Sequence, residues 1–278
     1  MKSFYAISGM PRAGSTLLCQ ILNSNPNFHV TPTSGILDML KTMRNNFSHS
    51  MSWKTQDRMK IYDNFRHGLK GFVEGFFHDK NIVFDKNRNW PGNIKLVDEI
   101  FSNKNFKIIW LYRNPVEIVS SMEAQYQKTY LLENIDEGNA PGAFLSLDRR
   151  IGTYINREGI MTMPIEFLKD AIEMGYSDRI LFITYYDLAH NTQTILDNIH
   201  DFIGEEKYSY DLDNIKQSTM EYDSLYNYKF LHTIKEGKIN FKKGDFILEQ
   251  KFVDVINKIF EPLNKLILER DPKMLLGV

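Results

Sequence analysis

A short turn near the start of the chain carries the residues best suited to chemistry. It reads SGMPRAGST at 8–16, and it joins an apolar stretch at 4–7 to a helical pattern that opens at Ser15. Two glycines followed by Ser-Thr at a helix N-terminus let backbone N–H groups converge on an anion, while the helix dipole adds partial positive charge. The turn therefore predicts a phosphate-binding loop.

This turn differs from the standard ATP-binding loop in its cation. The standard pattern needs Lys where this chain has Ser15, and the cation here is Arg12 instead. We expect Arg12 to bind a phosphorylated ligand together with backbone and hydroxyl groups of Ala13, Gly14, Ser15 and Thr16.

A second cation follows the apolar stretch at 106–112. Arg113 precedes an Asn-Pro pair, and proline in the first turn is a helix-start signal. Arg113 is thus predicted at the carboxyl end of a strand, where open α/β sheets bind ligands. Ser121 lies about two helical turns further on and can face back toward that end. An arginine fork with a hydroxyl suits a second phosphate, and a structural ion pair of Arg113 is the alternative.

Five apolar runs of strand length alternate with helical patterns along the chain, at 4–7, 28–30, 82–84, 108–111 and 180–184. This alternation predicts an α/β fold with a central, mainly parallel sheet of five strands covered by helices. The 278 residues show no internal repeat and no low-complexity linker, so we expect a single domain over 1–278.

Several helical patterns and one loop complete this prediction. Helices are expected at 144–156, 165–174, 192–203 and 246–268, and an irregular, tyrosine-rich region at 208–228. The polar stretch 133–142 is interpreted as a loop, either a lid or a plain connection. A stripe of apolar residues at helical spacing is expected to pack into the core: Met59, Tyr62, Phe65, Leu69, Phe72, Val73 and Phe76.

Composition limits the classes of partner. A formal net charge of −1 and a pI near 6.7 give no overall field for nucleic acid or anionic membranes. Since no apolar run reaches about 20 residues, we expect no membrane span and a cytoplasmic location. The single cysteine, Cys19, falls among apolar residues of the first helix and is interpreted as a packed thiol.

The two anion-binding segments together resemble the fingerprints of sulfotransferases that use 3′-phosphoadenosine 5′-phosphosulfate (PAPS). In that family a Pro-Arg-x-Gly-[Ser/Thr]-[Ser/Thr] turn holds the 5′-phosphosulfate, and an Arg-[Asn/Asp]-Pro turn with a later Ser holds the 3′-phosphate. Residues 11–16 match the first pattern, and 113–115 with Ser121 match the second. The likeness extends over residues 3–245 and is closest to the branch of tyrosylprotein sulfotransferases and bacterial sulfotransferase-like proteins.

The resemblance implies a P-loop-like three-layer fold and a reaction. A sulfuryl group would pass from PAPS to the hydroxyl of a small-molecule or peptide acceptor, with release of adenosine 3′,5′-bisphosphate (PAP) and without a metal. The rival interpretations are a P-loop kinase-like phosphotransferase that uses Arg12, and a non-catalytic nucleotide-binding protein.

Further residue roles follow only from the resemblance. Lys86 matches a lysine beside the sulfate that assists the leaving group, and Ser218 resembles a serine on the sulfate side. Lys242 and Lys243, followed by glycine, are similar to a late basic turn that closes over the 3′-phosphate, with a solvated surface loop as the alternative.

The general base for the acceptor hydroxyl stays open at this stage. Tyrosylprotein sulfotransferases have a glutamate after the second strand, whereas this chain has TPTS at 31–34. His29, at the end of the second predicted strand, has a suitable unperturbed pKa near neutrality. Glu123 and Asp85 are further candidates because both lie near the ends of elements that carry phosphate-binding residues, and burial raises the pKa of a carboxylate toward a useful range.

Overall fold

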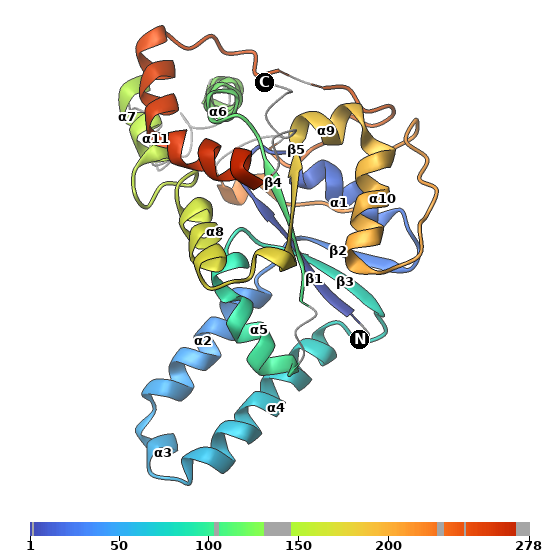
Figure 1. The fold of residues 1–278 in the computed structure, drawn as a ribbon, viewed down its shortest axis with the longest axis vertical. Helices are drawn as coiled ribbons and strands as arrows, with labels where there is room; N and C mark the ends of the chain where they lie inside the picture. The colour runs from blue at the N-terminus through green and yellow to red at the C-terminus, as the bar shows by residue number, and fades with distance from the viewer. Residues whose placement is uncertain (2, 103–105, 131–145, 227–230, 242, 271–278) are drawn as a thin grey trace.

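A five-stranded sheet forms the centre of the protein. The computed structural model describes residues 1, 3–102, 106–130, 146–226, 231–241 and 243–270 (Figure 1). The strands are β1 (Ser3–Gly9), β2 (Phe28–Thr33), β3 (Ile82–Lys86), β4 (Ile108–Tyr112) and β5 (Ile180–Thr184). Their order is β2-β3-β1-β4-β5 and every neighbouring pair is parallel, which confirms the predicted α/β sheet.

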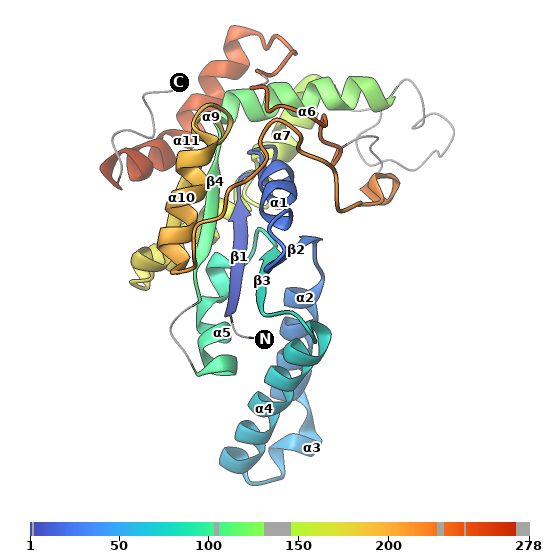
Figure 2. The same ribbon diagram turned by 90° about the vertical axis from the view of Figure 1, so that its right-hand side faces the viewer.

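Helices cover both faces of this sheet. In Figures 1 and 2, α1 (Ser15–Asn23) and α10 (Thr192–Ile203) lie on one face, and α5 (Ile94–Phe101) and α8 (Met163–Glu173) on the other. Because both faces are covered, the inner strands read as continuous apolar runs rather than as alternating patterns. The core between these layers includes the fully buried side chains of Trp90, Trp110, Phe84 and Phe106.

The order of the strands places three carboxyl ends side by side. The chain builds β2 and β3 on one side of β1 and then crosses to add β4 and β5 on the other side. Ligands of open α/β sheets bind where the strand order reverses in this way. The turns after β3, β1 and β4 therefore share one edge of the sheet.

Further helices lie around that carboxyl edge. Figures 1 and 2 show α6 (Pro115–Tyr130), α7 (Leu147–Ile155) and α11 (Gln250–Arg270) at this end of the molecule. The helix α9 (Tyr185–His190) follows β5, and short 3₁₀ turns occur at η1 (Pro91–Asn93), η2 (Ser177–Arg179) and η3 (Asp223–Tyr226). The predicted loop at 133–142 lies outside the described residues, and the single-domain organisation stays a prediction.

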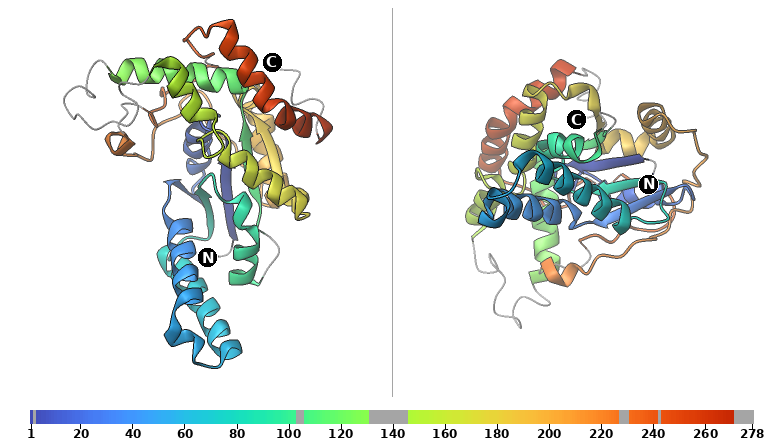
Figure 3. Two further views of the ribbon diagram at one scale, coloured as in Figure 1. Left: turned by 90° about the vertical axis from the view of Figure 1, so that its left-hand side faces the viewer. Right: turned by 90° about the horizontal axis from the view of Figure 1, so that it is seen from below.

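Three helices form an arm that projects beyond the opposite edge of the sheet (Figures 2 and 3). They are α2 (Ile36–His49), α3 (Met51–Lys54) and α4 (Arg58–Phe76). The prediction that the apolar stripe of α4 packs into the core is correct for Leu69 and Val73 but wrong for Met59 and Phe76, which are 76% and 60% exposed. The arm extends away from the body, so only part of the stripe has a covering layer.

The single cysteine is buried in the interior of the protein. Cys19 is 1% exposed within α1, and burial raises the pKa of its thiol to about 12. A thiol in this environment is a packing group and a poor nucleophile. None of the described helices combines the length and the apolar character needed to cross a bilayer.

Position 9, the last residue of β1, requires glycine for two reasons: its backbone conformation and a close backbone neighbour. Its φ is 131°, and a Cβ added there would lie 2.3 Å from the carbonyl oxygen of Leu111. We expect Gly9→Ala to lower the free energy of unfolding by about 2 kcal/mol or more, measured by urea denaturation. The added Cβ would clash with the backbone of Leu111, which can move only if the pairing of β1 with β4 is disturbed.

The matched control is Gly68→Ala in α4, where an added Cβ meets no atom within 4 Å. It is expected to raise the free energy of unfolding by about 0.5–1 kcal/mol, since glycine is a poor residue for a helix interior. Equal effects of the two substitutions would contradict the packing of β1 against β4 at Gly9.

Candidate active site

The predicted phosphate-binding loop lies between β1 and α1. Two of its residues have left-handed backbone conformations, Arg12 with φ 57° and Gly14 with φ 89°. No side chain caps the N-terminus of α1, so its first-turn N–H groups lack that internal partner. This is the arrangement that binds anions at helix N-termini.

The loop also touches the structure after β5. A Cβ on Gly14 would lie 2.7 Å from the ring of Tyr185, so this position has no room for a side chain. The Arg113 guanidinium in turn lies over this ring, with its Cζ atom 4.4 Å from the centre of the Tyr185 ring. One aromatic ring therefore packs against both predicted anion-binding turns.

The two predicted cation sites are in direct contact. Arg113 Nη1 donates a hydrogen bond to the backbone oxygen of Arg12 at 3.0 Å, and Arg12 Nε donates to Ser121 Oγ at 3.2 Å. The structure thus brings together Arg12, Arg113 and Ser121, which come from the turns after β1 and β4 and from the second turn of α6.

Local sequence explains why Arg113 points into this site. The Oδ1 atom of Asn114 accepts a hydrogen bond from the backbone N–H of Val116 at 2.9 Å, and Pro115 occupies the first position of α6. These features begin the helix directly after Arg113. Arg113 is 7% exposed, and its Nε donates to Glu117 Oε2 at 3.1 Å.

The electrostatics of the pair favour an anionic ligand. Burial and then the charge of Arg113 lower the pKa of Arg12, whereas Tyr185 and Asp223 partly offset this effect. An arginine stays charged in proteins, so the lowered pKa means that two like charges are held close together in a poorly solvated place. An anion bound between them relieves that repulsion.

Lys86 adds a third cation from β3, the other neighbour of β1. Its Nζ lies 2.6 Å from Oε1 of Glu221, and the two side chains are only 10% and 8% exposed. Its backbone N–H donates to Thr31 Oγ1 at 3.1 Å, which fixes the end of the strand. Burial opposes the charge of Glu221, but Lys86 outweighs burial and the pKa of this carboxyl is lowered.

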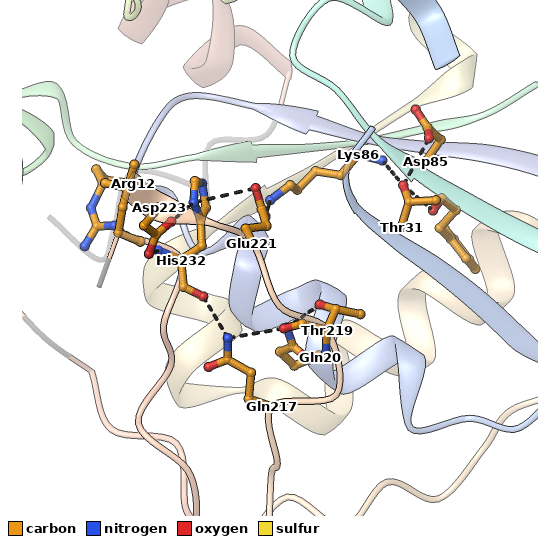
Figure 4. A network of polar contacts seen from close by, with 12 residues as sticks. Arg12, Gln20, Thr31, Asp85, Lys86, Gln217, Thr219, Glu221, Asp223 and His232 are labelled. Atoms are coloured by element: carbon orange, nitrogen blue, oxygen red, sulfur yellow. Dashed lines mark hydrogen bonds and ion pairs between the residues drawn. The ribbon is translucent and has the colours of Figure 1, made fainter. Parts of the chain in front are cut away.

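The partner of Lys86 belongs to a segment of which the sequence assigned only Ser218 to the site. We call this segment the strap and define it as residues 215–226 and 231–237. His232 Nδ1 lies 2.6 Å from Asp223 Oδ1 and 3.6 Å from Glu221 Oε2 (Figure 4). The backbone N–H of His232 donates to Asp223 Oδ2 at 3.0 Å. Glu221, Asp223 and His232 therefore form one partly buried cluster beside Lys86.

The strap is anchored to the phosphate-binding loop and to α1. Arg12 Nη1 donates to the carbonyl oxygen of Leu231 at 2.6 Å. Gln20 of α1 holds the other end through its side chain, which accepts from the backbone N–H groups of Ser218 and Thr219 at 2.7 and 3.1 Å. Figure 4 shows Gln20 beside Thr219. Apart from the resemblance at Ser218, the sequence marked this stretch only as irregular and tyrosine-rich, with neither helix nor strand pattern.

The structure does not place the sequence-predicted base candidates in this site. His29 pairs with Val83 at the start of β2, remote from the carboxyl edge, and its ring packs 6.0 Å from that of Phe77. Burial and then Lys80 lower its pKa. We therefore withdraw His29 as a base.

The two carboxylate candidates, Glu123 and Asp85, are both buried and hydrogen-bonded to neighbouring side chains. Glu123 is fully buried, with Arg150 Nη2 at 2.6 Å and the Tyr154 hydroxyl at 3.0 Å. Asp85 is also fully buried, and it accepts from Thr31 Oγ1 at 3.0 Å and Trp90 Nε1 at 2.8 Å. Burial raises the pKa of Asp85. Neither carboxylate is retained as a base.

The remaining predicted donor-binding residues are Ser218, which lies against α1, and the lysines that precede Gly244. Ser218 Oγ donates to Gln20 Oε1 and accepts from Asn23 Nδ2, both at 2.9 Å, so it fastens the strap to α1 rather than facing Arg12. Lys243 is exposed, and Lys242 lies outside the described residues. The next residue, Gly244, packs on α6, where an added Cβ would lie 2.4 Å from Ser120 Oγ and 3.1 Å from the Ser121 nitrogen. Gly244 thus packs beside Ser121, which belongs to the second cation site.

A parallel sheet with a glycine-containing loop between β1 and α1 is the architecture of P-loop-like α/β proteins. Within this class, the family model of the sulfotransferase domain matches residues 5–265, and the chain belongs to that family. The family and enzyme class predicted from the sequence are therefore confirmed.

Solved structures agree at the level of the fold. The sulfotransferase domain from the curacin biosynthetic pathway is 15% identical, covers 95% of this chain and 98% of that chain, and gives a TM-score of 0.50. A sulfotransferase from Alicyclobacillus acidocaldarius is 11% identical over 94% and 92%, also with a TM-score of 0.50. STF9 from Mycobacterium avium is 14% identical over 95% and 76%, with the same score. Among curated proteins, no sequence match was found.

Proposed function

We propose that this protein transfers a sulfuryl group from PAPS to a hydroxyl acceptor and releases PAP. The observation that carries the proposal is the contact between the turns after β1 and β4, through Arg113 Nη1 and the backbone oxygen of Arg12. A donor with phosphates on both sides of its ribose needs two neighbouring anion sites. These turns supply them, and family membership supplies the reaction class.

The residues present fit this donor. The first turn of α1, with Arg12, Ser15 and Thr16, would hold the 5′-phosphosulfate, since it offers uncapped N–H groups and a guanidinium. Arg113 and Ser121 would hold the 3′-phosphate, and the turn at Lys243 would approach from above α6. The donor binds as substrate, and its chemistry is the release of an activated sulfuryl group.

The cations around the loop are placed to stabilise the leaving group. Negative charge develops on the oxygen that bridges sulfur and phosphorus as that bond breaks. Fixed donors aimed at developing charge make a large contribution in a poorly solvated site. Arg12 follows β1 and Lys86 ends the adjacent strand β3, and this proximity supports the proposal that both contact this oxygen.

His232 is the base that we propose for the acceptor hydroxyl. A carboxylate only accepts hydrogen bonds, so Asp223 fixes the tautomer with the proton on Nδ1 and the lone pair on Nε2. Burial and then Lys86 lower the pKa of His232, although Glu221 and Asp223 oppose this shift. The imidazole is therefore neutral near pH 7 and competent to accept a proton.

Thermal shift with nucleotides tests the donor assignment. PAP at about 100 times its dissociation constant should add about 2.7 kcal/mol to the free energy of unfolding. ATP with Mg²⁺ at the same concentration should add less. Stronger stabilisation by ATP with Mg²⁺ would favour the kinase-like rival, and PAP binding without transfer to a broad hydroxyl panel would favour the non-catalytic one.

Removing the carboxylate that pairs with Lys86 should change donor binding. We expect Glu221→Gln to tighten PAP binding about tenfold, because an anion close to the 5′-phosphate no longer competes for Lys86. Isothermal titration calorimetry measures this change. Glu249→Gln, an exposed surface change outside the site, should have no effect. Weaker PAP binding in Glu221→Gln would show that this carboxylate instead orients Lys86 for the donor.

A further inference from the structure

A pocket of about 380 Å³ lies in the projecting arm, away from the phosphate-binding loop. The end of α2 together with α3, α4 and α5 lines it, and these elements extend from the amino edge of the sheet, opposite α6 and α11 (Figures 2 and 3). Its volume falls within the range of about 300–1000 Å³ typical of small-molecule sites. The sulfuryl-transfer site described above uses none of its residues.

Aromatic side chains make one wall of the pocket. The rings of Phe47 and Phe65 are stacked 4.0 Å apart at an interplanar angle of 5°, and the Trp53 ring lies 5.5 Å from that of Phe47. Trp53 and Tyr62 are 43% and 41% exposed, so this wall is open to a ligand. Aliphatic side chains complete the apolar lining: Ile61, Leu69, Leu96 and Ile100.

Three cations and one carboxylate stand among the lining residues. Arg66 is already engaged by Asp63 at 3.5 Å and Ser102 Oγ at 3.2 Å, and the Tyr62 hydroxyl donates to Glu99 Oε2 at 3.0 Å. Arg44 and Lys54 form no ion pair with any residue in the described part of the chain. Because the one lining carboxylate, Glu99, accepts its hydrogen bond from Tyr62 and Arg66 is already engaged, the pocket keeps an excess of positive charge beside the apolar wall.

We propose that this pocket binds a small amphipathic anion. The aromatic or aliphatic body would lie on the wall of Phe47, Phe65 and Trp53, and its sulfate, sulfonate or carboxylate would lie at Arg44 and Lys54. Apolar burial supplies the affinity, and the two cations select for charge. A free organic sulfate and a fatty or aromatic carboxylate share this chemistry, and the ligand series below distinguishes them.

Trp53 provides a direct reporter for the proposal. The other two tryptophans, Trp90 and Trp110, are fully buried in the core. Titration with 1-anilinonaphthalene-8-sulfonate should give saturable energy transfer from tryptophan, and Trp53→Phe should remove most of it. The probe is then displaced with 2-naphthyl sulfate, 2-naphthoate and neutral 2-naphthol. We expect both anions to compete at least tenfold better than the alcohol, and the better anion identifies the source.

Charge variants complete the test. Arg44→Gln combined with Lys54→Gln should weaken binding of the probe at least tenfold, which corresponds to about 1.4 kcal/mol. Lys60→Gln, an exposed cation of α4 outside the lining, should leave binding unchanged. Saturating PAP and the Arg12→Ala variant should also leave it unchanged, so this site is tested independently of the donor site. Displacement of the probe by PAP, equal competition by the alcohol, or unchanged affinity in the double variant would overturn the proposal.

Discussion

Replacing Arg12 by alanine is expected to lower kcat for sulfuryl transfer by about 100- to 1000-fold, the loss typical of removing a fixed donor from developing charge. Arg12 is the cation of the phosphate-binding loop and contacts both Ser121 Oγ and the strap. Steady-state kinetics with a hydroxyl acceptor, and calorimetry with PAP, separate the effect on transfer from the effect on donor binding.

Two further substitutions make this test specific. Arg12→Gly removes the guanidinium and also suits the left-handed φ of 57°, so it should lose the same activity without loss of stability. Arg113→Ala should mainly raise the dissociation constant of PAP, since Arg113 is assigned to the 3′-phosphate. Arg149→Ala, an exposed arginine of α7, serves as the control. Full activity in Arg12→Gly, or unchanged PAP binding in Arg113→Ala, would contradict the assignment of the two anion sites.

The second large effect is expected at His232. His232→Asn should lower kcat by about 100- to 10,000-fold, the range for a lost general base, with PAP binding preserved. The imidazole accepts a proton only when neutral, so the rate of the unmodified enzyme should fall as pH drops through the pKa of His232. Because burial and Lys86 lower that pKa, the decline should begin below the ordinary pH range of histidine.

Asp223→Asn should change the pH dependence of the rate in a known direction. The carboxylate of Asp223 raises the pKa of His232, through a hydrogen bond and through its charge. Its removal should therefore shift the acid limb of the pH–rate profile to still lower pH, while the plateau falls because the tautomer is no longer fixed. His29→Gln should leave both the plateau and the limb unchanged. A limb that does not move in Asp223→Asn would exclude His232 as the titrating group.

The sheet and the two anion-binding turns could be predicted from the sequence because their signals are local. Each strand contains a short apolar run; Arg113 directly follows β4, and Arg12 lies in the turn that follows β1. Parallel strands bring their carboxyl ends to one edge, so local position was enough to predict that the two turns lie at the same edge. The direct contact between Arg113 and Arg12, across 101 residues, is a finding of the structure.

The strap could not be predicted in this way. Lys86 meets Glu221 across 135 positions, and Gln20 meets Ser218 across 198 positions, in a stretch without periodicity. No local pattern records such contacts, because side chains in irregular segments are placed by the surfaces around them.

The interpretation of His29 failed for a different reason. The apolar run suggested that the second strand ends near residue 30, but β2 continues through Pro32 to Thr33. Proline is tolerated there because β2 lies at the edge of the sheet, where one set of N–H groups has no partner strand. His29 therefore begins the strand that it was expected to end.

Under the proposed roles of Arg12 and His232, the hydrogen bond from Arg12 to the carbonyl of Leu231 would couple binding of the donor to binding of the acceptor. The Arg12 guanidinium would contact the donor, and it also contacts Leu231, the residue next to the proposed base. A substrate that moves this guanidinium would therefore change the binding free energy of the other substrate. Such coupling is reciprocal: whatever factor PAP imposes on the acceptor's dissociation constant, the acceptor must impose on that of PAP. The order in which the two substrates bind can therefore alter rates of turnover but not the size of this factor.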